Sequence, residues 1–138
     1  MNYPAVKYSA DWNGKLTSTN SAFSDLRIWN ENKYQVGHYY DVYLKDKVRK
    51  NDCAELVAAQ PVMLKNITEA MAWLTTGYPL HSFLTIINKM YADYIRENGE
   101  TALFGWYVFH WVSRDAIADN QKENVSNWML NKELQEIE

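Results

Sequence analysis

The sequence predicts an α+β fold: a small mixed β-sheet closed into a barrel, two helices before the last long strand, and a C-terminal helical tail. Three patterns carry this prediction. Residues 38–44 alternate with the period of two that is typical of a strand. Residues 80–95 carry apolar side chains at helical spacing. Residues 102–112 form a long, nearly continuous apolar run, which indicates a central strand.

The first half of the chain reads mainly as strands. Residues 4–8 predict a short first strand, and residues 11–24, rich in Asn, Ser and Thr, predict a loop with a short helix near Phe23. Residues 45–52 are charged and predict a hairpin connection. The following stretch, 53–64, is compatible with a strand in which Pro61 marks a bend or an edge.

The second half contains the helices. Residues 66–69, Asn-Ile-Thr-Glu, have the form of a capping box and predict a helix that Gly77 and Pro79 end. The amphipathic run from residue 80 predicts a second helix that ends at Asn98-Gly99. We expect a barrel domain over residues 1–113 and a helical extension over 114–138.

Composition favours a protein of the cytoplasm. The single Cys53 excludes an intrachain disulfide, and the N-terminal residues lack the pattern of a signal peptide. No apolar run approaches the ~18 residues of a membrane-spanning helix. We therefore expect a cytoplasmic protein with no membrane partner.

Charge is unevenly distributed along the chain. The net charge is −3, which argues against strong nonspecific binding to nucleic acid. Residues 1–50 carry a net charge of +3, however, and residues 51–138 carry −6. The positive half contains residues 25–44, where Arg27 and Trp29 precede a polar turn and a strand. A basic side chain and a stackable ring at the mouth of a small β-structure favour a site for a base.

Several motifs of this chain resemble the ASCH family, a branch of the PUA-like β-barrels that includes domains binding RNA and modified bases. These motifs lie between about residue 6 and residue 112 and occur in the order of the family. They are Gly14-Lys15, Arg27 ahead of a polar turn, Val36-Gly37 before a strand, residues 62–69 at the entry of the capped helix, and the aromatic strand 104–112.

The chain also departs from the family pattern. His38 stands where the family has the Asp of its turn. The family's Lys-x-x-Thr-x-Arg run fits in two ways: starting at Lys15 it ends on Asn20, whereas counting back from Gly37 places Arg27 near the Arg position but Ala22 at the Lys position. An insertion between Asn20 and Arg27 reconciles the two, and we favour it.

The resemblance implies two activities. Some members are similar to amidohydrolases that deacylate N4-acetylcytidine with a hydroxyl nucleophile, an activating Lys and a Glu. Here Lys15 and Ser18 would fill the first two roles, with Thr17 or Thr19 as alternatives, but residues 73–76 lack the carboxylate and leave only Glu69. Binding needs less. We therefore favour a module that binds RNA, other single-stranded nucleic acid or a nucleoside, RNA more than DNA, and leave enzymatic activity as the alternative.

The candidate ligand-binding residues are Lys15, Arg27, Trp29, Trp12 and Trp73. The cations can contact a phosphate or a base edge, and the rings can stack on a base. Alternatively, Trp29 only covers the mouth of the barrel and Arg27 forms a surface ion pair. Trp106 and Trp111 point to opposite faces of their strand by parity, and we expect both in the core.

The sequence gives little support for other functions. The three His are far apart without a Cys partner, so we expect no metal site, and no cofactor motif is present. A third possibility is a protein-interaction module or homodimer. It would use the apolar stripe of the C-terminal helix, which includes Val125, Trp128 and Met129.

Overall fold

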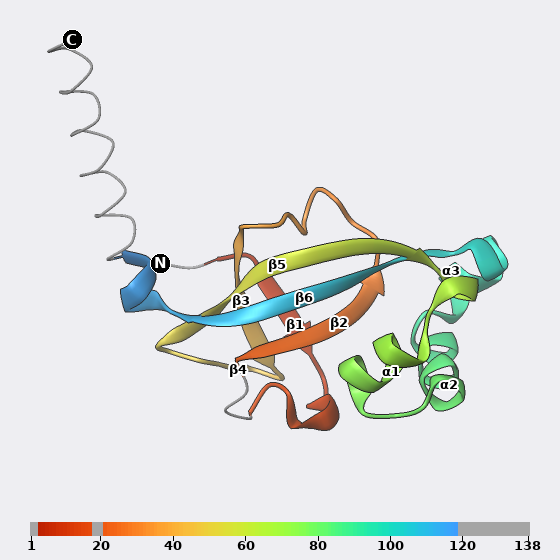
Figure 1. The fold of residues 1–138 in the computed structure, drawn as a ribbon, viewed down its shortest axis with the longest axis horizontal. Helices are drawn as coiled ribbons and strands as arrows, with labels where there is room; N and C mark the ends of the chain where they lie inside the picture. The colour runs from red at the N-terminus through yellow and green to blue at the C-terminus, as the bar shows by residue number, and fades with distance from the viewer. Residues whose placement is uncertain (1–2, 18–20, 119–138) are drawn as a thin grey trace, which may run out of the picture.

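The computed structural model describes residues 3–17 and 21–118 and confirms an α+β domain built on one mixed sheet. The strands lie in the order β1-β3-β5-β6-β2, with β4 paired to β3 (Figure 1). β1 runs parallel to β3, and every other pair is antiparallel. The strand bounds are β1 Ala5–Tyr8, β2 Ala22–Ile28, β3 Tyr39–Leu44, β4 Lys47–Val48, β5 Asp52–Met63 and β6 Leu103–Ser113.

The sheet curls but does not close, which corrects the predicted barrel. Within the described residues no backbone ladder joins its two edge strands, β1 and β2. The edges nevertheless face each other, because Arg27 on β2 donates a hydrogen bond of 2.7 Å from Nη2 to the carbonyl oxygen of Lys7 on β1. The Arg27 side chain, and not a backbone-to-backbone ladder, bridges this gap. We call the gap between β1 and β2 the seam.

The two faces of the sheet bury separate apolar clusters, as alternation along a strand requires. On β6, Tyr107 and Phe109 belong to the cluster inside the curl, whereas Phe104 belongs to the cluster under the helices. Trp111 packs on the first cluster and Trp106 on the second, so the parity prediction for both rings is confirmed. The sheet therefore has two cores.

Helix α1, Glu69–Thr76, has the predicted bounds but a different cap. Thr68, not Asn66, is the N-cap residue: its hydroxyl accepts a hydrogen bond from the Met71 amide. The carboxylate of Glu69 instead accepts a hydrogen bond of 2.7 Å from the amide of Leu80, at the start of the next helix. The Asn66 capping box was therefore wrong, because a hydroxyl closer to the helix was available.

The predicted second helix is divided in two. Helix α2 covers Leu80–Met90 and α3 covers Ala92–Asn98, with Tyr91 between them at φ −119° and ψ 36°. Helices α1, α2 and α3 lie between β5 and β6 in sequence and gather at one end of the sheet (Figure 1). Helix α1 contacts β2 and α2, so the helices lie next to the seam strand β2.

The region before residue 28 differs most from expectation. The helix predicted near Phe23 is part of β2, which begins at Ala22 and pairs with β6 along its whole length.

Pro61 stands in the half of β5 that pairs only with β6 among the described residues, which agrees with its predicted edge position.

The C-terminal extension 114–138 is tested only at its start. Residues 114–118 are helical, and 119–138, which include Val125, Trp128 and Met129, lie outside the described residues. The domain boundary at residue 113 therefore remains a prediction. In the described part of the chain, no helix is long and apolar enough to cross a membrane.

Candidate functional site

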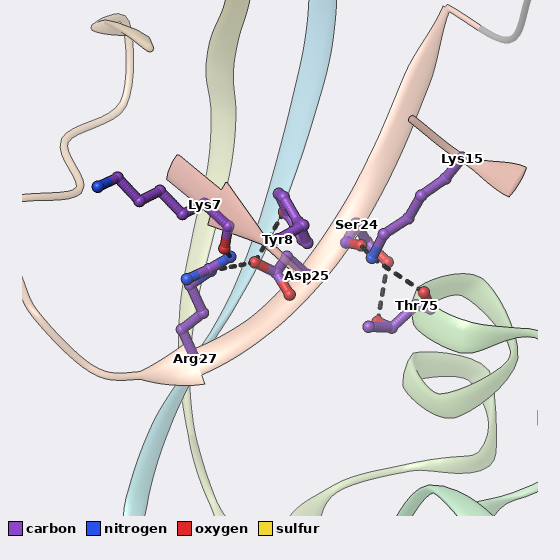
Figure 2. A network of polar contacts seen from close by, with 7 residues as sticks. All are labelled: Lys7, Tyr8, Lys15, Ser24, Asp25, Arg27 and Thr75. Atoms are coloured by element: carbon purple, nitrogen blue, oxygen red, sulfur yellow. Dashed lines mark hydrogen bonds and ion pairs between the residues drawn. The ribbon is translucent and has the colours of Figure 1, made fainter. Parts of the chain in front are cut away.

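A small cleft of about 100 Å³ opens at the seam, between β1, β2, the turn around Lys15 and helix α2. It contains three of the side chains predicted from the sequence, Trp12, Lys15 and Arg27. Asp25 lies between the two cations and completes the polar floor (Figure 2). The other lining residues are Lys7, Tyr8, Ser9, Leu26, Thr75, Thr76, Phe83, Ile86, Ile87, Met90 and Tyr91.

Strand β2 presents Asp25 and Arg27 on one face because the two residues are separated by two positions. Arg27 Nε donates a short hydrogen bond to Asp25 Oδ2, and the Tyr8 hydroxyl donates to the same oxygen at 2.8 Å. Within the described residues, Asp25 Oδ1 has no hydrogen-bond partner. The Asp25 side chain is 10% exposed, so this acceptor remains available to a ligand.

The turn before Lys15 places its ammonium in the seam. Asn13 and Gly14 adopt left-handed conformations at φ 59° and 64°, which these two residue types tolerate best. Asp11 fixes the turn by accepting hydrogen bonds from the Leu16 amide and the Thr17 hydroxyl. The chain is thereby turned so that Lys15 is only 5% exposed.

The Lys15 ammonium bridges β2 and α1. Nζ donates to the carbonyl oxygens of Ser24 at 2.7 Å and Thr75 at 3.0 Å, which leaves one N–H of the ammonium (Figure 2). Beside it, the hydroxyls of Ser24 and Thr75 hydrogen-bond each other at 3.0 Å. Helix α1 thus contributes backbone and hydroxyl groups to the cleft, but no carboxylate.

Tyr8 lies between the two cations. Its ring centroid is 5.3 Å from Lys15 Nζ and 4.6 Å from Arg27 Cζ, distances at which a cation attracts a ring face. Burial, together with the Asp25 carboxylate, raises the pKa of the Tyr8 phenol well above its usual value. Tyr8 is therefore a neutral hydroxyl that donates to Asp25.

The two cations respond differently to burial. Burial lowers the pKa of the Lys15 ammonium, and the nearby Asp25 carboxylate only partly opposes this effect. Burial acts in the same direction on Arg27, but the charge and hydrogen bond of Asp25, together with Tyr8 and Tyr34, outweigh it and hold the pKa of the guanidinium above its ordinary value. Arg27 is thus a permanent cation, whereas Lys15 is the group whose proton is more easily lost.

The cleft has an apolar wall and an aromatic rim. Helix α2 supplies the wall, with Phe83 and Ile87 buried and Met90 57% exposed at the outer end. Trp12 stands at the rim with its ring centroid 6.1 Å from that of Tyr78, in an edge-to-face arrangement. Flat apolar ligands can therefore contact both a wall and a ring.

The other two predicted Trp residues do not reach the cleft. Trp29 packs on the inner core, parallel to the buried Tyr107 with ring centroids 5.9 Å apart. Trp73 lies on α1 with 51% of its surface exposed and does not line the cleft. The alternative interpretation of Trp29, that it covers the β-structure, agrees with its position.

Of the predicted catalytic partners of Lys15 that the structure describes, neither Glu69 nor Thr17 lines the cleft. Glu69 binds the Leu80 amide and does not line the cleft. Ser18 and Thr19 lie outside the described residues. The Thr17 hydroxyl donates a hydrogen bond to Asp11, and Thr17 lines another hollow. The hydroxyls that the structure brings to Lys15 are those of Ser24 and Thr75.

That other hollow measures about 720 Å³ and lies between Trp111 and the β3–β4 hairpin. Arg49 covers the Trp111 ring at 3.8 Å and donates to the carbonyl oxygen of Leu16 at 2.7 Å. The residues on its border, Thr17 and Ser21, flank the segment 18–20 that the structure does not describe. None of Lys15, Arg27 and Trp12 lines this hollow, so we place the candidate site at the seam.

Sequence reasoning missed Tyr8, Asp25 and Thr75. One signal was available: Asp25 and Arg27 are opposite charges two residues apart, the spacing that places a pair on one face of a strand. Tyr8 and Thr75 gave no local signal, because they reach the site only through the curl of the sheet and the docking of α1. No group of three or more His, Cys, Asp or Glu side chains suited to a metal occurs among the described residues.

Comparison with solved structures assigns the fold. No family model matches the chain, and no curated protein matches it in sequence. An ASCH domain from Lactobacillus crispatus superposes with a TM-score of 0.51 at 17% identity, covering 81% of this chain and 79% of its own. A DUF984 protein from Enterococcus faecalis gives 0.54 at 16% identity, covering 82% of both chains. This chain has an ASCH-type fold, and the predicted resemblance is confirmed at the level of the fold.

Proposed function

We propose that this protein binds the base of a nucleoside or of a single-stranded nucleic acid in the seam cleft. One observation carries the proposal: Lys15, Arg27 and Trp12, from separate parts of the sequence, meet in one cleft around the carboxylate of Asp25. A base offers this combination its counterparts, which are hydrogen-bonding edges and a stackable face.

The cleft places hydrogen-bond acceptors and donors next to each other. Asp25 Oδ1 can accept from an amine or ring N–H, while Lys15 retains one N–H and Arg27 retains donors beyond those bound to Asp25 and Lys7. The edges of bases place donors and acceptors next to each other in this way. An anion alone would meet the Asp25 carboxylate, so the floor suits a base better than a phosphate.

The size of the cleft agrees with a single base. Its volume of about 100 Å³ lies below the range of ~300–1,000 Å³ that drug-sized ligands occupy, so the sugar and any phosphate would remain outside. The wall from Phe83 to Met90 would contact the base, and Trp12 at the rim could stack on it.

Calorimetric titration with the common nucleosides, N4-acetylcytidine and a short single-stranded homopolymer series tests the proposal. We expect at least one ligand to bind, and Trp12→Ala to weaken its binding at least about fivefold, since a stacked base contributes ~1–3 kcal/mol. The matched control is Trp73→Ala, which removes an exposed ring outside the cleft. No binding by any ligand, or equal loss in both variants, would overturn the proposal.

Arg27 is tested with two variants because it also holds the seam together. Arg27→Ala removes the donor to Asp25 and Lys7, whereas Arg27→Lys keeps the charge and loses the planar fork. We expect both to weaken binding while the circular dichroism spectrum stays native. A folded Arg27→Lys protein with unchanged affinity would remove Arg27 from the site.

A hydrolytic alternative is favoured by one observation, the lowered pKa of Lys15 beside the hydroxyl pair of Ser24 and Thr75. An amine that loses its proton readily can activate a hydroxyl. The titration with N4-acetylcytidine separates the two functions. Release of acetate that is lost in Lys15→Met and in Thr75→Val would indicate an amidohydrolase, whereas binding without turnover agrees with a recognition module.

A further inference from the structure

A second hollow adjoins the cleft and shares Lys7 with it. This hollow measures about 360 Å³ and is lined by Ala5, Lys7, Tyr43, Lys45 and Asp46. Lys7 also lines the seam cleft, so its side chain stands on the boundary between the two depressions. In Figure 2 the ammonium of Lys7 extends away from the Asp25–Arg27 pair.

The turn of the β3–β4 hairpin brings Lys45 to the same boundary. The hairpin joins Leu44 to Lys47 through a two-residue turn, in which Lys45 adopts a left-handed φ of 56°. The Lys45 amide donates a hydrogen bond of 2.8 Å to the carbonyl oxygen of Tyr8, the residue after Lys7. Two exposed lysines from β1 and the hairpin thus line one hollow.

A third lysine lies near Arg27. Lys33, in the loop between β2 and β3, places its ammonium 5.3 Å from the centroid of the Tyr34 ring. Burial lowers the pKa of the Lys33 ammonium, and the nearby charges of Arg27 and Lys7 lower it further. Within the described residues, Lys7, Lys33 and Lys45 form no salt bridge.

Lys7 and Lys45 line the hollow with a single carboxylate, Asp46, and form no salt bridge with it, so the two ammonium groups favour an anionic ligand outside the cleft. Once a base fills the cleft there is no room for its phosphate as well, so the phosphate would lie at the mouth, beside the exposed Lys7. A continuing chain would pass from the mouth over Lys7 into the hollow beside Lys45, where a second phosphate meets the next lysine.

We propose that the ligand is one nucleotide within a single-stranded polynucleotide, and that its phosphodiester backbone crosses Lys7 from the cleft into the hollow lined by Lys45. The inference rests on the proposed function, because the cleft must hold the base that fixes the strand in place. The protein carries a net charge of −3, so attraction of a polyanion depends on this local group and not on the chain as a whole.

The experiment compares three ligands of increasing length with the full-length protein. Calorimetry measures binding of the nucleoside preferred in the titration above, its monophosphates and a labelled eight-nucleotide single strand, as RNA and as DNA. We expect affinity to rise with each phosphate. We also expect the slope of log affinity against log salt to indicate at least two neutralised phosphates for the eight-mer, at ~0.7 per phosphate.

The variants Lys7→Gln and Lys45→Gln should each reduce that slope by ~0.7 for the eight-mer. Lys45 lies outside the cleft, so Lys45→Gln should also leave nucleoside affinity unchanged. Lys65→Gln is the matched control, because this exposed lysine lines none of the three hollows. Equal slopes in wild type and both variants would overturn the inference. The RNA and DNA arms identify the sugar, and tighter binding of either strand agrees with the proposal.

The two proposals fail in different ways. A nucleoside that binds as tightly as the eight-mer overturns the strand inference and leaves the base-binding function intact. Absence of binding by nucleoside and strand alike overturns the base-binding function. Strand binding that is lost in Lys7→Gln but unaffected by Trp12→Ala and Arg27→Lys would identify a purely electrostatic surface, which contradicts the base site and, with it, the passage of the strand from the cleft.

Discussion

The hydroxyl of Tyr8 donates a hydrogen bond of 2.8 Å to Asp25 Oδ2 and thereby connects the two edge strands of the sheet, β1 and β2. Arg27 repeats the connection by donating to the same carboxylate and to the Lys7 carbonyl oxygen. The candidate binding residues are thus also the residues that hold the curled sheet together, so their substitutions must be judged by stability as well as by binding.

Asp25→Ala should be the most destabilising change in the cleft. It leaves the Tyr8 hydroxyl and the Arg27 guanidinium without their common acceptor, and breaking a buried ion pair costs ~3–5 kcal/mol. We expect the lower end of that range, because the Arg27 side chain is 23% exposed.

Tyr8→Phe removes one hydrogen bond to a charged group and should cost ~1.5–3 kcal/mol.

Urea denaturation of both variants measures these changes in the free energy of unfolding. A matched control is Tyr39→Phe, which alters a tyrosine outside the seam. An Asp25→Ala protein as stable as wild type would show that the Asp25 carboxylate is not needed to hold β1 against β2.

The protonation of Lys15 should depend on Asp25. Since burial lowers the pKa of the ammonium and Asp25 raises it, Lys15 should titrate below its ordinary value of ~10.4, and Asp25→Asn should lower the midpoint further. NMR of the side-chain Cε resonance reports the midpoint, and Lys89, on the exposed part of α2, serves as the internal control. A midpoint that rises in Asp25→Asn would contradict the proposed electrostatics.

The same shift has a consequence for stability. Between the lowered pKa of folded Lys15 and the ordinary pKa of the unfolded chain, the unfolded state binds more protons. The contribution of Lys15 to the free energy of unfolding therefore increases as the pH rises through this window. Comparison of wild type with Lys15→Met across the window isolates this contribution, and a slope of the opposite sign would show that the ammonium is favoured in the folded state.

Gly77→Ala should destabilise the junction that positions Lys15. Gly77 ends α1 at φ +76°, and a Cβ there would stand 2.9 Å from Asn13 Oδ1 in the turn before Lys15. Gly37→Ala is the control, because Gly37 also has a positive φ, +89°, in a turn closed by the hydrogen bond from the His38 amide to the Gln35 carbonyl oxygen, and no atom lies within 4 Å of the added Cβ.

Gly77→Ala and Gly37→Ala both carry the conformational cost of ~1–2 kcal/mol for a side chain at positive φ, and only Gly77→Ala adds the contact with Asn13. Thermal unfolding should therefore show a larger loss for Gly77→Ala, and ligand affinity should fall in that variant alone. Equal effects of the two substitutions would mean that Asn13 moves aside without disturbing Lys15.

Trp29→Ala should act on stability and not on binding. The ring stacks on Tyr107 and covers the inner core, so its removal should cost ~2–3 kcal/mol, less than for a fully buried Trp. Trp73→Ala, which removes a ring 51% exposed on α1, should change the free energy of unfolding by less than ~1 kcal/mol. Weaker ligand binding by a folded Trp29→Ala protein would place this ring in the site.

The sequence predicted the elements with strong periodicity and missed those that tertiary contacts create. Helix α1 and strands β3 and β6 follow from local patterns, and the fold resemblance was confirmed. Strand β2 was missed because Asp25 and Arg27 interrupt its apolar pattern. Their charges are tolerated in a strand only because they pair with each other and with Tyr8 across the seam.

The candidate site was predicted in part, for a related reason. Lys15 and Arg27 were found as cations in a loop and before a turn, and the structure brings both to the cleft. The choice among Trp residues depended on geometry that no local pattern contains: Trp12 faces the cleft, Trp29 faces the core and Trp73 faces outward. Docking of α1 against β2 decided the place of Thr75.

The open seam also bears on self-association. Edge strands expose unpaired backbone groups that can recruit a strand from another molecule. Here the two edges face each other, and Arg27 occupies the Lys7 carbonyl oxygen, an acceptor on the edge of β1. The guanidinium therefore protects the edge of β1 from pairing with another molecule. We expect a variant without it to expose this edge to strands of neighbouring molecules and to aggregate on storage.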